Sequence, residues 1–248
     1  GASSVDRVDY SNDIATASPK GPLSSVRQKM GATGNASFGY FGGGNPGPVT
    51  TVDRIDYSND TATASPKGPL SVASRSLAAT GNINFGYFAG GRIAAVPPET
   101  SRVDRIDYSN DTATASPKGP LSAARGYGLQ ATGNQSFGYF GGGSSPAKST
   151  VDRIDYGNDT ATASPKGPLS SSRNYIAATG NASFGYFGGG GSPTKTTVDR
   201  IDYSSDTGTA PAKGPLSVAR YALAATGDAS FGYFGGGAPG PKSTVDRI

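Results

Sequence analysis

The side chains that could do chemistry in this chain are few in kind. Of its 248 residues none is His or Cys, and Glu99 is its single glutamate. Without these groups the usual general bases, thiolate nucleophiles, disulfides and Cys/His zinc sites are excluded. We therefore predict a protein that is not an enzyme and that carries no cofactor and no metal ion.

Two short patterns could still bind a ligand. Asp56-x-Ser58-x-Asp60 places oxygen atoms at alternate positions, as calcium loops do, but an Asx-type turn between two strands has the same letters. We favour the turn. Gly42-x-Gly44-x-x-Gly47 matches a dinucleotide fingerprint by letter, yet no helical pattern follows it, so it predicts no nucleotide site.

The charged residues belong to a motif that returns along the whole chain. Val-Asp-Arg begins at Val5, Val52, Val103, Val151, Val198 and Val245, in steps of 47, 51, 48, 47 and 47 residues. A period of this size indicates one supersecondary unit stacked many times. The repeat therefore predicts a single domain over residues 1–248.

Each unit contains four short segments that read as strands. Examples are residues 221–225, 231–234, 198–203 and 61–65, which are rich in β-branched, aromatic or alternating small residues and end at Gly, Pro, Asn or Asp. No segment has apolar residues at helical spacing. Four strands in about 47 residues is the size of one propeller blade.

The motifs of each unit resemble those of the kelch family. Tyr40-Phe41-Gly42-Gly43 is similar to its strand ending in two glycines, and Pro215-Leu216-Ser217-x-x-Arg220 is similar to the segment before the next blade. The kelch tryptophan is absent, and Thr63 lies near its place. The repeats are also similar to those of proteins encoded by marine phages, which implies a virion-associated or extracellular location.

Aligned on the kelch strand order A to D, the chain contains five A–B and five C–D pairs. We predict an all-β fold: a five-bladed β-propeller of four-stranded antiparallel blades, closed by pairing the N- and C-terminal strands. The terminal residues 245–248 duplicate residues 5–8, and both cannot occupy one place. A sixth, incomplete blade is the alternative.

The Asp and Arg of the motif are predicted to form ion pairs between neighbouring blades, because both faces of a blade are covered. The residues are Asp53, Arg54, Asp104, Arg105, Asp152, Arg153, Asp199 and Arg200.

Sequence variation among the units is confined to the B–C loop and the D–A connection, which share one face of a propeller. A lysine in every D–A connection (Lys20, Lys67, Lys118, Lys166 and Lys213) predicts that this face is basic. The candidate ligand-binding residues on it are Lys29, Arg92, Tyr127, Lys148, Tyr175, Lys195, Tyr221 and Lys242.

Two functions fit these observations. One is a structural or display scaffold, either a viral structural protein or an engineered symmetric protein. The other is a lectin-like module that binds a glycan or an anionic polysaccharide through the variable face, with modest contacts multiplied over the blades. We expect a monomer that neither binds nucleic acid nor inserts into a membrane, since the net charge is only +4 and no apolar run reaches spanning length.

Overall fold

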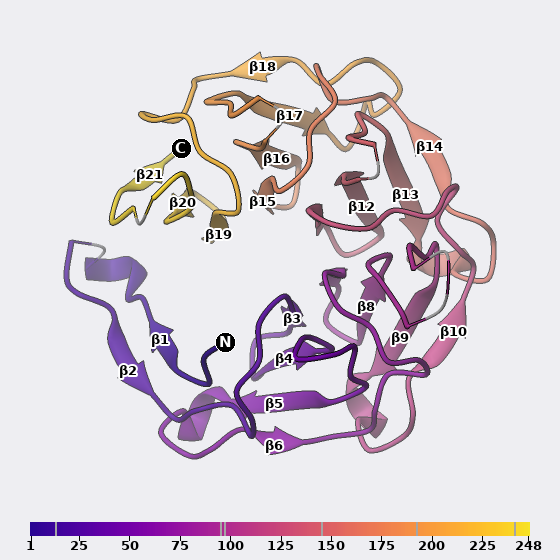
Figure 1. The fold of residues 1–248 in the computed structure, drawn as a ribbon, viewed down its shortest axis with the longest axis vertical. Helices are drawn as coiled ribbons and strands as arrows, with labels where there is room; N and C mark the ends of the chain where they lie inside the picture. The colour runs from indigo at the N-terminus through magenta and orange to yellow at the C-terminus, as the bar shows by residue number, and fades with distance from the viewer. Residues whose placement is uncertain (13, 95, 97, 145, 192, 241) are drawn as a thin grey trace.

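The computed structural model describes residues 1–248 except 13, 95, 97, 145, 192 and 241. Short strands make up almost all of its regular structure, and they form antiparallel sheets arranged as blades around a central opening (Figure 1). Four single-turn 3-10 helices follow four of the strands: η1 (Tyr10–Asn12), η2 (Tyr57–Asn59), η3 (Tyr108–Asn110) and η4 (Tyr156–Asn158). No helix within the described residues is long and apolar enough to cross a membrane.

Five blades have three inner strands in the order A, B, C, and four of these blades add an outer strand D. From the centre outward they are β3 (Gly31–Gly34), β4 (Phe38–Gly42), β5 (Val52–Asp56) and β6 (Ser65–Pro66); β7 (Ala78–Gly81), β8 (Phe85–Ala89), β9 (Val103–Asp107) and β10 (Ser116–Lys118); β11 (Leu129–Gly133), β12 (Phe137–Gly142), β13 (Val151–Asp155) and β14 (Ser164–Lys166); β15 (Ala177–Gly180), β16 (Phe184–Gly188), β17 (Val198–Asp202) and β18 (Ala212–Lys213); and β19 (Ala224–Gly227), β20 (Gly232–Gly235) and β21 (Val245–Arg247).

The predicted all-β, five-bladed propeller of antiparallel blades is confirmed. The register is the same in each blade: Tyr40 of strand B lies opposite Arg54 of strand C, and Tyr87 lies opposite Arg105. Identical register follows from near-identical sequence, because a slip of one residue would move every buried side chain to the wrong face.

The predicted closure of the ring is wrong. Strand β20 pairs with β21, which follows it in the chain, and not with the N-terminal strand. The N-terminal segment instead forms a separate two-stranded sheet of β1 (Val5–Arg7) and β2 (Ser18–Lys20). This sheet takes the place of the incomplete sixth blade, and it lies between β19–β21 and β3–β6 in Figure 1.

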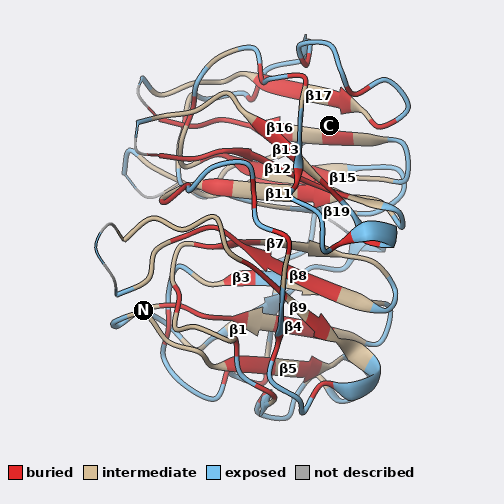
Figure 2. Ribbon diagram, turned by 90° about the vertical axis from the view of Figure 1, so that its right-hand side faces the viewer, coloured by how far each residue is buried: buried red, intermediate tan, exposed pale blue. Residues whose placement is uncertain are grey.

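The core consists of the surfaces between neighbouring blades. The ring of Phe88 packs on Gly42 of the preceding blade, where an added Cβ would lie 2.6 Å from the ring. Tyr40 stacks on Tyr108 of the following blade, with ring centres 4.7 Å apart. Buried residues therefore follow the strands in Figure 2, while the turns and loops at both ends are exposed.

Candidate functional site

The charged residues of the Val-Asp-Arg motif form two kinds of ion pair. The aspartate is buried and pairs within its own blade with the arginine that ends Pro-Leu-Ser-x-x-Arg: Arg27 Nη2 lies 2.6 Å from the Asp53 carboxylate, and Arg125 lies 2.5 Å from Asp152. Arg173 forms the same pair with Asp199. The prediction that these aspartates join neighbouring blades is therefore wrong, because strand C turns this side chain toward the D–A connection of its own blade.

The arginine of the motif does contact the next blade. Arg54 reaches Asp111 and Arg105 reaches Asp159, both at 2.7 Å, and Arg153 reaches Asp206 at 2.8 Å. A tyrosine of strand B shares the same acceptor, since the hydroxyl of Tyr40 donates to Asp111 at 2.9 Å. Arg200 forms no printed ion pair among the described residues and instead covers the ring of Phe184 at 4.3 Å.

One unit exchanges the position of its buried cation. The second unit has Ser74 where the others have arginine, which would leave Asp104 without its partner. It also has Arg102 where the others have threonine, and the Arg102 Nε lies 3.3 Å from Asp104. Two substitutions thus preserve one ion pair.

The lysines of the D–A connections do not make the variable face basic. Lys20 pairs with Asp60 of the next blade at 3.3 Å, and Lys118 pairs with Asp159 at the same distance. Lys67 and Lys166 form equivalent pairs at 3.5 Å. The prediction is wrong because each lysine lies beside an aspartate from the following unit, which charge counting along one unit does not reveal.

The Asp-x-Ser-x-Asp pattern is a turn. Asp56 caps η2 by accepting hydrogen bonds from the Ser58 amide at 2.9 Å and the Ser58 hydroxyl at 2.6 Å. These hydrogen bonds hold the pKa of Asp56 below its usual value. Asp60 is paired with Arg7 and Lys20, so the carboxylates of this pattern are already satisfied by protein groups.

The variable B–C loops and D–A connections lie together at one end of the propeller. Short bridges join them: Gln28 pairs with Asn45, Arg75 with Arg92, Asn174 with Gly191, and Tyr221 with Ala238. The loop residues of one unit are therefore held against the residues that enter strand A of the same unit, around the end of the central channel.

A cavity of about 320 Å³ opens at this end of the channel. Its inner wall is apolar and consists of one side chain from the start of strand A in each of the five blades. Its outer wall carries polar and aromatic groups. The five apolar residues are Met30, Leu77, Leu129, Ile176 and Leu223.

The residue before each of these apolar side chains has a left-handed backbone. The φ values are 61° for Lys29, 58° for Ser76, 51° for Tyr175 and 53° for Ala222, and Gly128 takes the fifth position with 71°. Non-glycine residues rarely adopt this conformation. Hydrogen bonds between blades hold it, since the Ser76 amide donates to the Lys29 carbonyl at 2.7 Å and the Ala222 amide donates to the Tyr175 carbonyl at 2.8 Å.

Cations and tyrosine rings gather beside this cavity. We call Lys29, Arg92, Tyr127, Tyr175 and Tyr221 the channel-mouth cluster. The Arg92 guanidinium lies 4.6 Å from the centre of the Tyr127 ring and donates to the Tyr127 hydroxyl at 2.5 Å, and the Lys29 ammonium lies 5.3 Å from the same ring. Burial, then the neighbouring Tyr127, raises the pKa of Tyr175.

The three tyrosines of the cluster form a row across three blades. The Tyr127 and Tyr175 rings are stacked with centres 6.1 Å apart, and Tyr175 meets Tyr221 edge-on at the same distance. Each ring comes from a different D–A connection, so only the closed curvature of the propeller brings them together. A row of half-buried rings beside two cations can hold a ligand that has both an apolar face and a negative charge.

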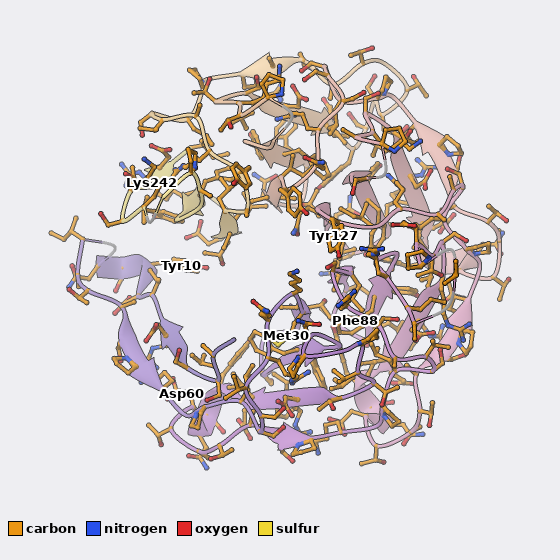
Figure 3. The ribbon with its side chains drawn as sticks, viewed as in Figure 1. Tyr10, Met30, Asp60, Phe88, Tyr127 and Lys242 are labelled. Carbon is orange, nitrogen blue, oxygen red and sulfur yellow. The ribbon has the colours of Figure 1, made fainter. Side chains whose placement is uncertain are left out.

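Five of the eight predicted ligand-binding residues therefore meet at one place, and three do not. Lys148, Lys195 and Lys242 are half-buried in B–C loops, and none of them lines the channel-mouth cavity. Figure 3 shows Met30 and Tyr127 beside the central opening and Lys242 away from it, on the blade that contains β21. The apolar wall was not predicted as part of the site, although the recurrence of one large apolar residue before each Ala-Thr-Gly could have indicated it.

Comparison with known proteins identifies the fold and no family. No protein-family model matches the chain, and no curated protein matches its sequence. Among solved structures, the one titled "Structure of YjhT" has a TM-score of 0.77 and 12% sequence identity, covering 99% of this chain and 93% of that chain. The similarity extends over the whole propeller, and at this identity it concerns the fold alone.

Proposed function

We propose that this chain is a non-enzymatic binding module whose ligand is an acidic carbohydrate, such as a sugar carrying a carboxylate or a sulfate group. The observation that carries the proposal is the channel-mouth cluster, where five variable residues from three elements of the ring converge on one cavity. Its volume of about 320 Å³ lies at the lower end of the range for small-molecule sites.

The chemistry of the cluster suits such a ligand. The negative faces of the Tyr127 and Tyr175 rings attract the polarised C–H bonds of a sugar ring, while Lys29 and Arg92 offer charge-assisted hydrogen bonds to an anionic group. The apolar wall excludes water from beneath the ligand. No His, Cys, Asp or Glu is among the described residues that line the cavity, which supports binding without a reaction.

Calorimetric titration with an oligogalacturonate tests the proposal. Wild-type protein should bind it at physiological salt and bind a neutral maltooligosaccharide of equal length more weakly. The substitution Tyr127→Ala removes the ring that both cations cover, so we expect at least a tenfold loss of affinity, about 1.4 kcal/mol. Lys242→Ala is the matched control, since it removes a cation outside the cluster, and it should leave the affinity unchanged.

A rigid structural or display scaffold is the second candidate. The observation that favours it is the repetition of buried Arg–Asp pairs and stacked tyrosines in successive blades, which stiffens the ring without regard to any ligand. If Tyr127→Ala and Lys242→Ala behave alike, or if no acidic carbohydrate binds, the scaffold role is supported.

A further inference from the structure

The inner edge of β1 differs from that of every equivalent strand. Strands β5, β9, β13 and β17 each pair with a strand B on one side and a strand D on the other. Within the described residues, β1 has the same Val-Asp-Arg sequence but pairs with β2 alone. Its inward edge therefore presents backbone amides and carbonyls to solvent, and such an edge can accept a further strand.

Asp6 of this strand lacks the partner that its counterparts have. Five of the six motif aspartates are ion-paired to an arginine, and in the complete blades they are almost fully buried. Asp6 is exposed and forms no ion pair with any described residue. In the other units the cation comes mostly from the segment that leads into strand A.

The blade that follows β1 exposes two aromatic rings. Tyr57 is 50% exposed, whereas its counterparts Tyr156 and Tyr203, which stack on a strand-B tyrosine of the preceding blade, are 9% and 8% exposed. Phe41 is half-buried, whereas the other four phenylalanines at this position are at most 2% exposed. Both rings face the side on which a preceding strand B would lie.

The blade before β1 is open in a complementary way. Gly42, Gly141 and Gly188 are each covered by a phenylalanine ring of the following blade. An added Cβ on their counterpart Gly235 would meet Val245 alone, at 3.5 Å, among the described residues. Gly235 thus offers the flat surface on which a strand-B phenylalanine packs elsewhere in the ring.

Two cavities border β1 at these places. One, of about 330 Å³, lies between Val8 and Gly235, and the other, of about 370 Å³, lies among Asp6, Phe41 and Tyr57. The two-stranded sheet itself is held in position, because Tyr10 stacks on Tyr233 of the preceding blade and Arg7 pairs with Asp60 of the following one. Figure 3 shows Tyr10 and Asp60 on either side of this open sector. The site is preorganised, which reduces the cost of binding.

We propose that the inner edge of β1 binds an A–B strand pair of this repeat, presented by another polypeptide that carries the sequence Pro-Leu-Ser-x-x-Arg followed by Phe-Gly-Tyr-Phe-Gly. Its arginine pairs with Asp6, its tyrosine stacks on Tyr57, and its phenylalanine packs on Gly235. Its second glycine receives Phe41. A second copy of this chain is a poor donor, since all five of its A–B pairs are paired within their own blades.

Titration with a peptide tests this interaction. A labelled peptide of residues 168–190 contains the required arginine, tyrosine and phenylalanine as Arg173, Tyr186 and Phe187. We expect saturable one-to-one binding to the full chain, measured by fluorescence anisotropy, and at least a tenfold loss with Asp6→Asn in the protein or Arg173→Ala in the peptide. Asp228→Asn is the control, because it removes one charge at a position where the four other units already have asparagine.

A fusion keeps the test decisive if the free peptide does not fold. Residues 168–193 are joined ahead of Gly1, which places the A–B pair before β1 in the order found in the other blades. We expect a higher Tm and slower amide hydrogen exchange at residues 5–8, with the Tm increase reduced by Asp6→Asn. Unchanged Tm and exchange in the fusion, or peptide affinity that is indifferent to Asp6→Asn, would overturn the proposal. Self-association of the fusion with unprotected β1 amides would also overturn it.

Discussion

At the scale of single residues, the recurring ion pairs show how the repeat tolerates change. The buried carboxylate at position 104 is kept while its cation moves from the expected position 74 to position 102. A buried carboxylate without a partner is costly, so the two positions are energetically coupled. The sequence shows the two unusual residues but not their link, because they are 28 positions apart, as 102 minus 74 gives.

The coupling is measurable by a double-mutant cycle. Arg102→Thr alone should lower the free energy of unfolding by about 2 kcal/mol, since Asp104 loses a charged hydrogen-bonding partner. Adding Ser74→Arg restores the arrangement of the other units and should recover most of that loss. Urea unfolding of the four proteins gives the interaction energy, and simple additivity would contradict the coupling.

Buried tyrosines set an alkaline limit to stability. Burial raises the pKa of Tyr108, Tyr156 and Tyr203, and burial together with an aspartate that accepts the hydroxyl proton raises the pKa of Tyr87 and Tyr139. An unfolded tyrosine ionises near pH 10.0, so the folded state binds more protons than the unfolded state above that pH. The stability from these groups is complete below pH 10.0 and is lost as the pH rises further.

We therefore expect the free energy of unfolding to fall above pH 10.0 by up to about 1.4 kcal/mol per pH unit for each such tyrosine. Absorbance at the tyrosinate band should rise together with the loss of circular dichroism. Ionisation of these tyrosines near pH 10.0 in a chain that remains folded would contradict their burial.

At the scale of elements, neighbouring units approach each other through backbone contacts. The amide of Gly119, after β10, donates to the Asp159 carbonyl of the next unit at 2.8 Å. A Cβ at Gly119 would lie 1.9 Å from the Ala161 carbonyl oxygen. Glycine is required here because of this close approach, and equivalent contacts recur at Gly21 and Gly68.

The same position in the last unit provides a matched control. An added Cβ at Gly214 would meet no described atom within 4 Å. Gly119→Ala should destabilise the protein by about 3 kcal/mol through overpacking, while Gly214→Ala should change stability by less than about 0.5 kcal/mol. Thermal unfolding of the two variants distinguishes a contact specific to complete neighbours from a general preference for glycine, which would affect both alike.

At the scale of the whole molecule, the repeat period and the strand patterns were enough to predict the five-bladed propeller. The closure was not predictable, because β1 and β21 have the same motif and either could pair with β20. The structure selects β21, which follows β20 through a short loop and so closes the smaller loop. Of the site, the variable tyrosines were predictable from differences among units, whereas the pairing of Lys20 with Asp60 depends on a neighbouring blade.

The whole ring also explains why the candidate site lies where it does. The channel-mouth cluster assembles residues that are far apart in the sequence, and the left-handed residues at the start of the A strands direct them to one place. The blades that carry these residues are themselves nearly invariant. Variation at the channel mouth on a constant frame is the arrangement expected of a recognition surface.

A glycan array that includes uronic-acid and sulfated polymers, read at low and physiological salt, tests the central claim most directly. Binding should persist at physiological salt. It should disappear in the double variant Tyr127→Ala, Tyr175→Ala and persist in Lys148→Ala, Lys195→Ala. An array without signal, or binding that is lost equally in both variants, would contradict a site at the channel mouth.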